Sequence, residues 1–198
     1  MVRILLDTSN NDLVVALASD KEIVGQKVYA CPHHQSEYLV EEIGKLLDEH
    51  HLTKDDIDGV VSSKGPGSYT GVRVALTVAK VMAFALNVPL YLVSSLEILK
   101  DPKKVSICLA NARNERSFFG VYDGDKVIVS DRILTDEDVK KYIEEHPDYV
   151  VKGDTNYLNI PSDTRYILEN LKNSAKKEYQ VEDVLKASPV YLKGTQTL

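Results

Sequence analysis

Two polar segments contain the residues most able to do chemistry in this chain. The first is Gly65-Pro66-Gly67-Ser68-Tyr69-Thr70-Gly71-Val72-Arg73, which holds three of the ten glycines and lies between a predicted strand and a predicted helix. α/β proteins often hold phosphate in such a turn, because backbone amides and a helix N-terminus attract anions. The second is Asp7-Thr8-Ser9, whose carboxylate and hydroxyls could hold a metal-bound phosphate.

The glycine spacing differs from both common phosphate motifs. A P-loop has four residues between its glycines and then Lys-Ser/Thr, whereas five separate Gly65 from Gly71 and Val72-Arg73 follows. The dinucleotide motif has two residues between its second and third glycines, and here there are three. The spacing therefore favours a tight turn in which Gly71 allows close packing of helix and sheet.

An anion at the start of this helix stays open as an alternative, because hydroxyls and free amides could receive it there. In the Asp7 segment, an Asx turn is the more common role for such residues. The weak candidates for cofactor binding are Asp7, Thr8, Ser9, Gly67, Ser68 and Thr70.

The chain shows no convincing metal or catalytic set. Cys31-Pro32-His33-His34 suggests zinc only weakly, since a zinc site needs about four ligands at characteristic spacings. Two cysteines do not make a disulfide framework. Neither a zinc-peptidase helix motif nor a serine nucleophile elbow occurs. We therefore predict no metal and no catalytic residue in this chain.

The elements that would position these segments alternate along the first half of the chain. The order β-β-β-α-β-α-β predicts a mixed sheet with an antiparallel edge, covered by helices. The predicted strands are residues 2–8, 13–18, 23–30, 57–63 and 90–93, and the predicted helices are residues 35–50 and 72–86.

The second half has a weaker pattern and no visible internal repeat. Asp101-Pro102-Lys103-Lys104 is the best boundary, dividing the chain into residues 1–100 and 101–198. The tail at residues 188–193 is predicted to be extended and the last five residues to be loosely held. The predicted strands are residues 105–109, 117–122, 126–129 and 149–152, and the predicted helices are residues 136–145 and 165–172.

The predicted helix at residues 72–86 is apolar on most of its faces. Such a helix is usually buried, but one face could cover the sheet while another meets a partner chain. Both interpretations stay open. For the second, the helix would act with residues 35–50, and the predicted partner-interface residues are Leu39, Ile43, Val72, Ala75, Leu76, Ala79, Met82 and Ala83.

Composition limits the classes of function. The chain has 198 residues and a net charge of −6, so strong direct binding to nucleic acid is not expected. No signal peptide is recognised, and no apolar run approaches the roughly 20 residues that a membrane span needs. We therefore expect a cytoplasmic protein.

Several of these segments together resemble one protein family. They are Asp7-Thr8-Ser9, the glycine segment, Val93-Ser94-Ser95-Leu96-Glu97, Asn111-Ala112-Arg113 and Pro189-Val190-Tyr191-Leu192-Lys193. In this order they resemble the TsaB (YeaZ) family of bacterial tRNA threonylcarbamoyladenosine biosynthesis. The resemblance extends over nearly the whole chain.

The resemblance implies an actin/Hsp70/sugar-kinase type of α/β fold with two ribonuclease-H-like domains, the second of them reduced. That reduction argues against the ATP site usually found between the domains of this fold. The resemblance also implies a non-catalytic subunit with no cofactor of its own. Two residues depart from the family pattern, Gln35 in place of its histidine and Asn111 in place of its aspartate.

The implied partners are a TsaD-like catalytic subunit and a TsaE-like ATPase, which would carry the metal and the ATP. TsaD transfers a threonylcarbamoyl group to an adenosine beside the tRNA anticodon, so this chain would reach tRNA only through the complex. A homodimer is a further expectation. The alternative hypothesis is an enzyme, a nucleotide-dependent phosphotransferase or ATPase that uses Asp7 and the loop at residues 65–71.

Overall fold

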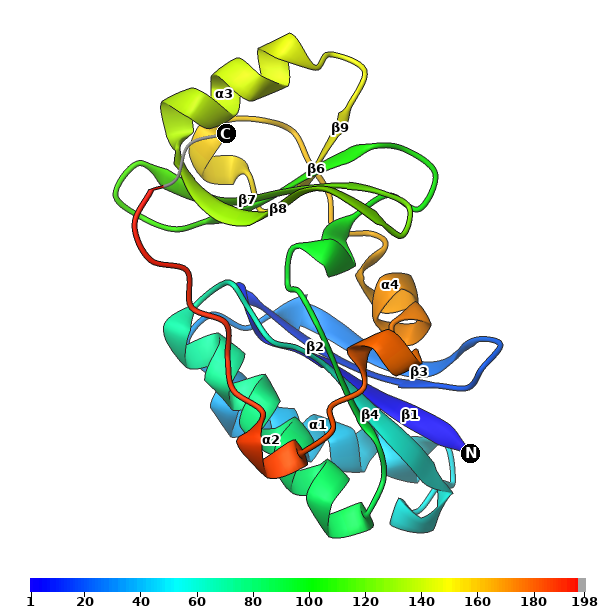
Figure 1. The fold of residues 1–198 in the computed structure, drawn as a ribbon. Helices are drawn as coiled ribbons and strands as arrows, with labels where there is room; N and C mark the ends of the chain where they lie inside the picture. Colours follow the sequence, from blue (N-terminus) through cyan, green and yellow to red (C-terminus); the bar gives the residue numbers. More distant parts are fainter. Residues whose placement is uncertain (196–198) are drawn as a thin grey trace.

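The computed structural model describes residues 1–195, in which two sheets alternate with helical layers (Figure 1). One layer of two helices lies below the first sheet, and a single helix lies above the second. A short helix and a linker lie between the sheets. The predicted loose end falls partly on residues 196–198, outside the described residues.

The first sheet confirms the predicted order β-β-β-α-β-α-β. Its strand order is β3-β2-β1-β4-β5, with β1 antiparallel to β2 and parallel to β4. The mixed sheet with an antiparallel edge is therefore also confirmed. Its elements are β1 (Val2–Asp7), β2 (Asp12–Ala18), β3 (Ile23–Ala30), α1 (Gln35–Glu49), β4 (Ile57–Ser63), α2 (Tyr69–Leu86) and β5 (Leu90–Val93).

The strands β1, β2 and β4 are buried on both faces, whereas the edge strand β3 is largely exposed. Side chains alternate between the two faces of a strand, so each buried strand contributes to two cores. Ile4 and Leu6 of β1 pack into the core shared with α1 and α2. Leu5 points to the other face, where it shares a core with Leu171 of α4 (Ile167–Asn173). The first sheet is thus completed by a helix from near the end of the chain.

The second sheet repeats most of the first in its connectivity. Its order is β8-β7-β6-β9, in which β6 is antiparallel to β7 and parallel to β9. This matches β3-β2-β1-β4, and α3 joins β8 to β9 as α1 joins β3 to β4. The elements are β6 (Ser106–Asn111), β7 (Arg116–Asp123), β8 (Lys126–Thr135), α3 (Asp136–Glu145) and β9 (Val150–Gly153).

Two element boundaries differ clearly from the sequence-based prediction. β8 has ten residues rather than four, because pairing with Phe118 and Phe119 of β7 carries it through the polar Ser130-Asp131-Arg132. α2 begins at Tyr69 rather than at residue 72, because the Ser68 hydroxyl caps it by accepting from the Gly71 amide at 3.3 Å.

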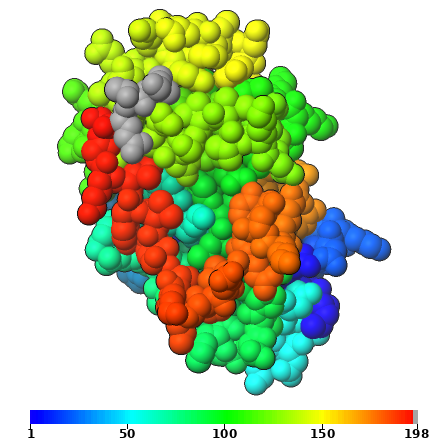
Figure 2. All heavy atoms as spheres, in the orientation of Figure 1, coloured from blue at the N-terminus to red at the C-terminus, as the bar shows by residue number. Residues whose placement is uncertain are grey.

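After β9 the chain returns to the first sheet. α4 contacts β1 and β4, and Gln180 forms an isolated bridge with Tyr91 of β5. A C-terminal strap, defined here as residues 184–191, then runs over the surface beside α2 (Figure 2). The predicted boundary at residue 101 stays a prediction. The 3-10 turns are η1 (Lys54–Asp56), η2 (Glu97–Leu99), η3 (Asn156–Leu158), η4 (Lys177–Tyr179) and η5 (Val184–Lys186).

α2 is long and apolar enough to cross a membrane by length and composition alone, and it is the one such helix in residues 1–195. The sequence-based expectation of no such segment is therefore not met on those two criteria. The core helix of a soluble protein passes the same test. In this fold Ala75, Leu76 and Ala79 of α2 pack into the core below the first sheet.

Candidate functional site

Three other segments that carry the family resemblance meet at the glycine segment. The Ser68 amide donates to the Ser9 carbonyl at 2.7 Å, which joins the loop to the end of β1. The Gly65 amide donates to the hydroxyl of Ser95, two residues after the end of β5, at 3.0 Å. The Val190 amide donates to the Lys64 carbonyl at 2.7 Å, so the C-terminal strap closes the cluster.

Asp7, Thr8 and Ser9 are buried in this cluster. The Ser9 amide donates to Asp7 Oδ1 at 3.1 Å, which confirms the predicted Asx turn. The Ser63 hydroxyl of β4 donates to the same oxygen. Burial raises the pKa of the Asp7 carboxyl, and these hydrogen bonds oppose that shift. Asp7 therefore fixes the turn at the end of β1.

The glycines allow α2 to approach this turn closely. A Cβ atom on Gly71 would collide with the Thr8 carbonyl oxygen, and one on Gly67 would collide with the Ser9 carbonyl oxygen. The Thr8 hydroxyl donates to the Gly71 carbonyl at 2.6 Å and accepts from the Ala75 amide at 3.1 Å. The packing interpretation of Gly71 is thus confirmed.

Several donors that could hold a phosphate are already used inside the chain. The amides of Gly65 and Ser68 bind Ser95 and Ser9, as above, and the Gly71 amide binds the Ser68 hydroxyl. Ser68 and Thr70 are exposed at the outer side of the loop. Cofactor binding by the weak candidates of the two segments stays a prediction.

A cleft of about 330 Å³ adjoins this cluster at the end of β1. Its lining includes Asp7, Asp12, Asp154 and Asp163. Burial, together with the charge of Asp154, raises the pKa of the Asp12 carboxyl. Four carboxyl groups would repel the phosphates of a nucleotide unless cations were bound as well. Within residues 1–195, no group of three or more His, Cys, Asp or Glu side chains is arranged to hold a metal ion.

The residues whose types suggested metal binding differ from one another in burial and contacts. Cys31 is buried, whereas His33 and His34 are exposed. Gln35 is buried, and its side-chain amide donates to the Asn10 carbonyl at 2.9 Å. Gln35 thereby ties the start of α1 to the loop after β1, which is a structural role.

The predicted partner-interface residues lie mainly inside the protein. Met82 is only partly buried, but the other seven are buried within the chain, most of them against the first sheet. A partner could not reach them without opening the helical layer, so the proposed surface must be revised. The seven are Leu39, Ile43, Val72, Ala75, Leu76, Ala79 and Ala83.

The same two helices also expose apolar side chains. Val81 and Phe84 of α2 are 61% and 62% exposed, and Val40 of α1 is 63% exposed. The two helices contact each other below the first sheet. The signal was present in the sequence, because Thr77, Val81 and Phe84 repeat at helical spacing on the side away from Ala75 and Ala79.

Aromatic and basic side chains join the start of α2 to the strap. The Arg73 guanidinium lies 3.9 Å from the Tyr69 ring centroid, and its Nε donates to the Tyr191 hydroxyl at 2.6 Å. The Tyr69 and Tyr191 rings stack with centroids 5.3 Å apart. The Tyr191 hydroxyl raises the pKa of Arg73 by accepting this hydrogen bond. Sequence alone gave no reason to pair residues 118 positions apart.

Comparison with known proteins identifies related sequences. The family model described as TsaD, tRNA N6-adenosine threonylcarbamoyltransferase, matches residues 28–139, more than half of the 198-residue chain. The tRNA threonylcarbamoyladenosine biosynthesis protein TsaB of Bacillus subtilis (strain 168) is 35% identical over 99 residues, or 50% of this chain and 43% of that protein. TsaB of Buchnera aphidicola subsp. Schizaphis graminum (strain Sg) is 28% identical over 59% of this chain and 58% of that protein.

The chain spans about half the length of these curated relatives. A solved structure, YeaZ from Pseudomonas aeruginosa, matches over 96% of this chain and 99% of its own, with a TM-score of 0.78 and 23% identity. This structural likeness confirms the fold class that the family resemblance implied, and the curated relatives confirm the resemblance itself.

Proposed function

This chain belongs to the family described as TsaD, tRNA N6-adenosine threonylcarbamoyltransferase, and from that premise we propose that it is a non-catalytic subunit in threonylcarbamoyladenosine modification of tRNA. Its relatives named TsaB support the pathway. The observation that carries the subunit role is that Val40, Val81 and Phe84 are 63%, 61% and 62% exposed on two helices that contact each other, because exposed apolar surface marks protein interfaces.

The proposed partner is a TsaD-like catalytic subunit, which contacts a helical face defined by Val40, Val81 and Phe84. A TsaE-like ATPase joins the assembly, and these partners carry the ATP and the metal. The chain reaches tRNA through them, consistent with its net charge of −6. Self-association of the free chain would use the same helical face, and the whole assembly would work in the cytoplasm.

The helical face is tested by comparing one substitution at three positions. Val81→Glu should leave the protein folded and weaken partner binding at least tenfold, because it places a charge in an apolar contact. Ala75→Glu should instead unfold the protein, since an unpaired charge against the sheet costs several kcal/mol. Val127→Glu is the matched control, because Val127 is 52% exposed but lies on β8 of the second sheet.

Size-exclusion chromatography with the purified TsaD-like subunit measures binding, and circular dichroism measures folding. If Val81→Glu co-eluted with the TsaD-like subunit as strongly as the wild type does, the helical face would be excluded as the binding surface. Reconstituted tRNA modification with and without this chain then tests the subunit role. ATP turnover by the isolated chain that Asp7→Asn abolishes would replace the proposal with the phosphotransferase or ATPase hypothesis.

A further inference from the structure

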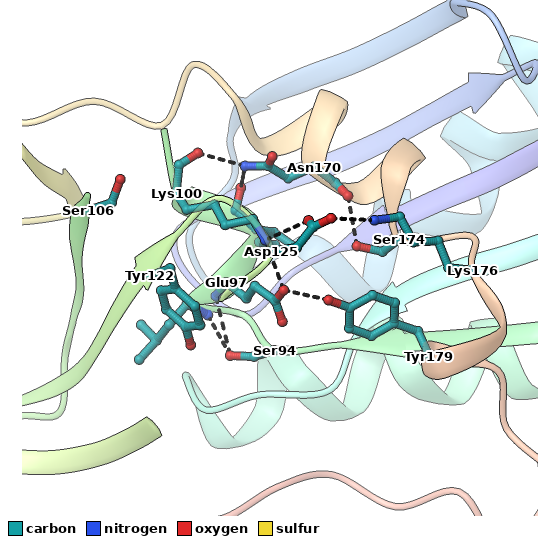
Figure 3. Close-up of polar contacts among 12 residues, drawn as sticks. Ser94, Glu97, Lys100, Ser106, Tyr122, Asp125, Asn170, Ser174, Lys176 and Tyr179 are labelled. Carbon is teal, nitrogen blue, oxygen red and sulfur yellow. Dashed lines mark hydrogen bonds and ion pairs between the residues drawn. The ribbon is translucent and has the colours of Figure 1, made fainter. Parts of the chain in front are cut away.

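A second pocket, of about 210 Å³, lies between the two sheets on the side shown in Figure 3. It is formed by the linker after η2, the turn between β7 and β8, α4 and the segment that leads into η4. Its lining residues are Lys100, Pro102, Gly124, Asp125, Asn170, Asn173, Ser174, Lys176 and Tyr179. Glu97, the last residue of one family segment, borders the pocket through its ion pair with Lys100, but no function described above uses the residues that line it.

Two lysine side chains converge on one carboxylate in the pocket. Lys176 Nζ lies 3.1 Å from Asp125 Oδ2, and Lys100 Nζ lies 3.7 Å from Asp125 Oδ1. Lys100 is buried and also pairs with Glu97 Oε1 at 3.0 Å. Lys176 holds the pKa of the Asp125 carboxyl below its ordinary value. The lysines thus form a binding position for a carboxylate, now filled by Asp125 (Figure 3).

The Asp125 carboxylate is poorly protected in this position. Its side chain is 76% exposed, on the turn between β7 and β8. An exposed ion pair contributes only about 0–1 kcal/mol, so a competing anion could displace it at little cost. Lys100, by contrast, is buried and has Glu97 as its nearer negative partner, so it stays paired when Asp125 is displaced.

The wall that α4 forms next to the lysines supplies polar groups, which hydrogen bonds within the chain keep in place. The Asn170 side-chain amide donates to the carbonyls of Ile98 and Lys100, both at 2.8 Å. These bonds fix the side chain, which is 5% exposed, and leave its carbonyl oxygen as an acceptor. Ser174 on the same wall donates to the Asn170 backbone carbonyl at 2.8 Å.

We propose that this pocket binds a small molecule bearing one carboxylate, which replaces the Asp125 side chain between Lys100 and Lys176. With Asp125 in place, its charge and those of Glu97, Lys100 and Lys176 sum to zero. Without it the sum is +1, which matches a single carboxylate better than a doubly charged phosphate. An acceptor on the Asn170 wall suits a hydroxyl or amino group elsewhere on that molecule.

The test titrates acetate into the folded chain and follows the backbone amides of Gly124 and Lys176 by NMR. Asp125→Asn removes the competing charge and keeps the shape, so it should bind acetate at least tenfold more tightly than the wild type. Asp123→Asn, at the exposed end of β7 just before that turn, is the matched control and should behave as the wild type. Adding Lys176→Met to Asp125→Asn should abolish binding.

Three results would overturn the proposal. The first is an absence of amide shifts in both the wild type and Asp125→Asn, which would leave the lysines as a structural ion pair only. The second is unchanged acetate binding after Lys176→Met. The third is tighter binding of inorganic phosphate than of acetate, which would contradict the single-charge argument. Because the isolated chain is used, none of these results bears on the proposed subunit role.

Discussion

Thr8 links the end of β1 to the first turns of α2. Its hydroxyl contacts both the Gly71 carbonyl and the Ala75 amide, across 63 and 67 positions of sequence. The sequence predicted the local turn at Asp7, because an Asx turn depends on neighbouring residues. It could not predict this role of Thr8, because the contacts form only after β1 and α2 pack together.

Gly71→Ala tests how closely these two elements approach. Its Cβ would collide with the Thr8 backbone oxygen, which cannot rotate away, so the free energy of unfolding should fall by about 3 kcal/mol or more. Gly44→Ala is the control, because nothing lies within 4 Å of its added Cβ on α1. The control should instead gain roughly 0.5–1 kcal/mol. Urea unfolding measures both, and equal changes would refute the close approach.

The buried carboxyl of Asp7 should make the free energy of unfolding depend on pH. Burial raises the pKa of its carboxyl, so the folded state binds that proton more tightly than the unfolded state. Protonated Asp7 therefore stabilises the folded state. This stabilisation is complete below the pKa of Asp7 in the unfolded chain, about 3.9, and is lost as the pH rises through its pKa in the folded protein. Asp7→Asn does not ionise, so it should match the wild type near pH 3.5 and be more stable at pH 7.

Thermal unfolding across this pH range measures the difference. Asp48→Asn, on the exposed side of α1, is the control for the same change of residue type made away from the Asp7 turn. If Asp7→Asn instead lost stability relative to the wild type as the pH rose, the ionised carboxylate would be the favoured form.

At the scale of elements, α2 shows what a sequence pattern can and cannot decide. Its apolar composition predicted a helix and left open whether all of it is buried. The structure buries Ala75 and Ala79 and exposes Val81 and Phe84, because the sheet covers only one side. In β8 the sequence pattern predicted too little structure. Its polar middle residues gave no strand pattern, but pairing with β7 continues the strand through them.

The C-terminal strap is held on α2 by Lys80. Its Nζ donates to the carbonyls of Leu185 and Ala187 at 2.8 and 2.7 Å. Hydrogen bonds to charged groups contribute about 1.5–3 kcal/mol, so Lys80→Met should speed hydrogen exchange of the Val190 amide at least tenfold. Lys140→Met, on exposed α3, should leave that exchange unchanged. Wild-type exchange in Lys80→Met would mean that the strap is held by its other contacts.

At the scale of the whole molecule, the two sheets share a connectivity that the sequence did not show as a repeat. Strand order β8-β7-β6-β9 matches β3-β2-β1-β4, although residue types differ. Connectivity depends on which strands pair, and those pairs join distant positions. The first sheet was predictable because its strands and helices are strongly patterned, whereas the return of α4 to it was not.

That return sets an order for synthesis on the ribosome. When β1 to β5 have emerged, α1 and α2 can cover one face of their sheet, but Leu5 on the other face still lacks its packing partner Leu171. That partner is translated only after the entire second sheet. The nascent chain therefore carries this apolar face without α4 while residues 94–166 are translated, a period in which a chaperone could bind it.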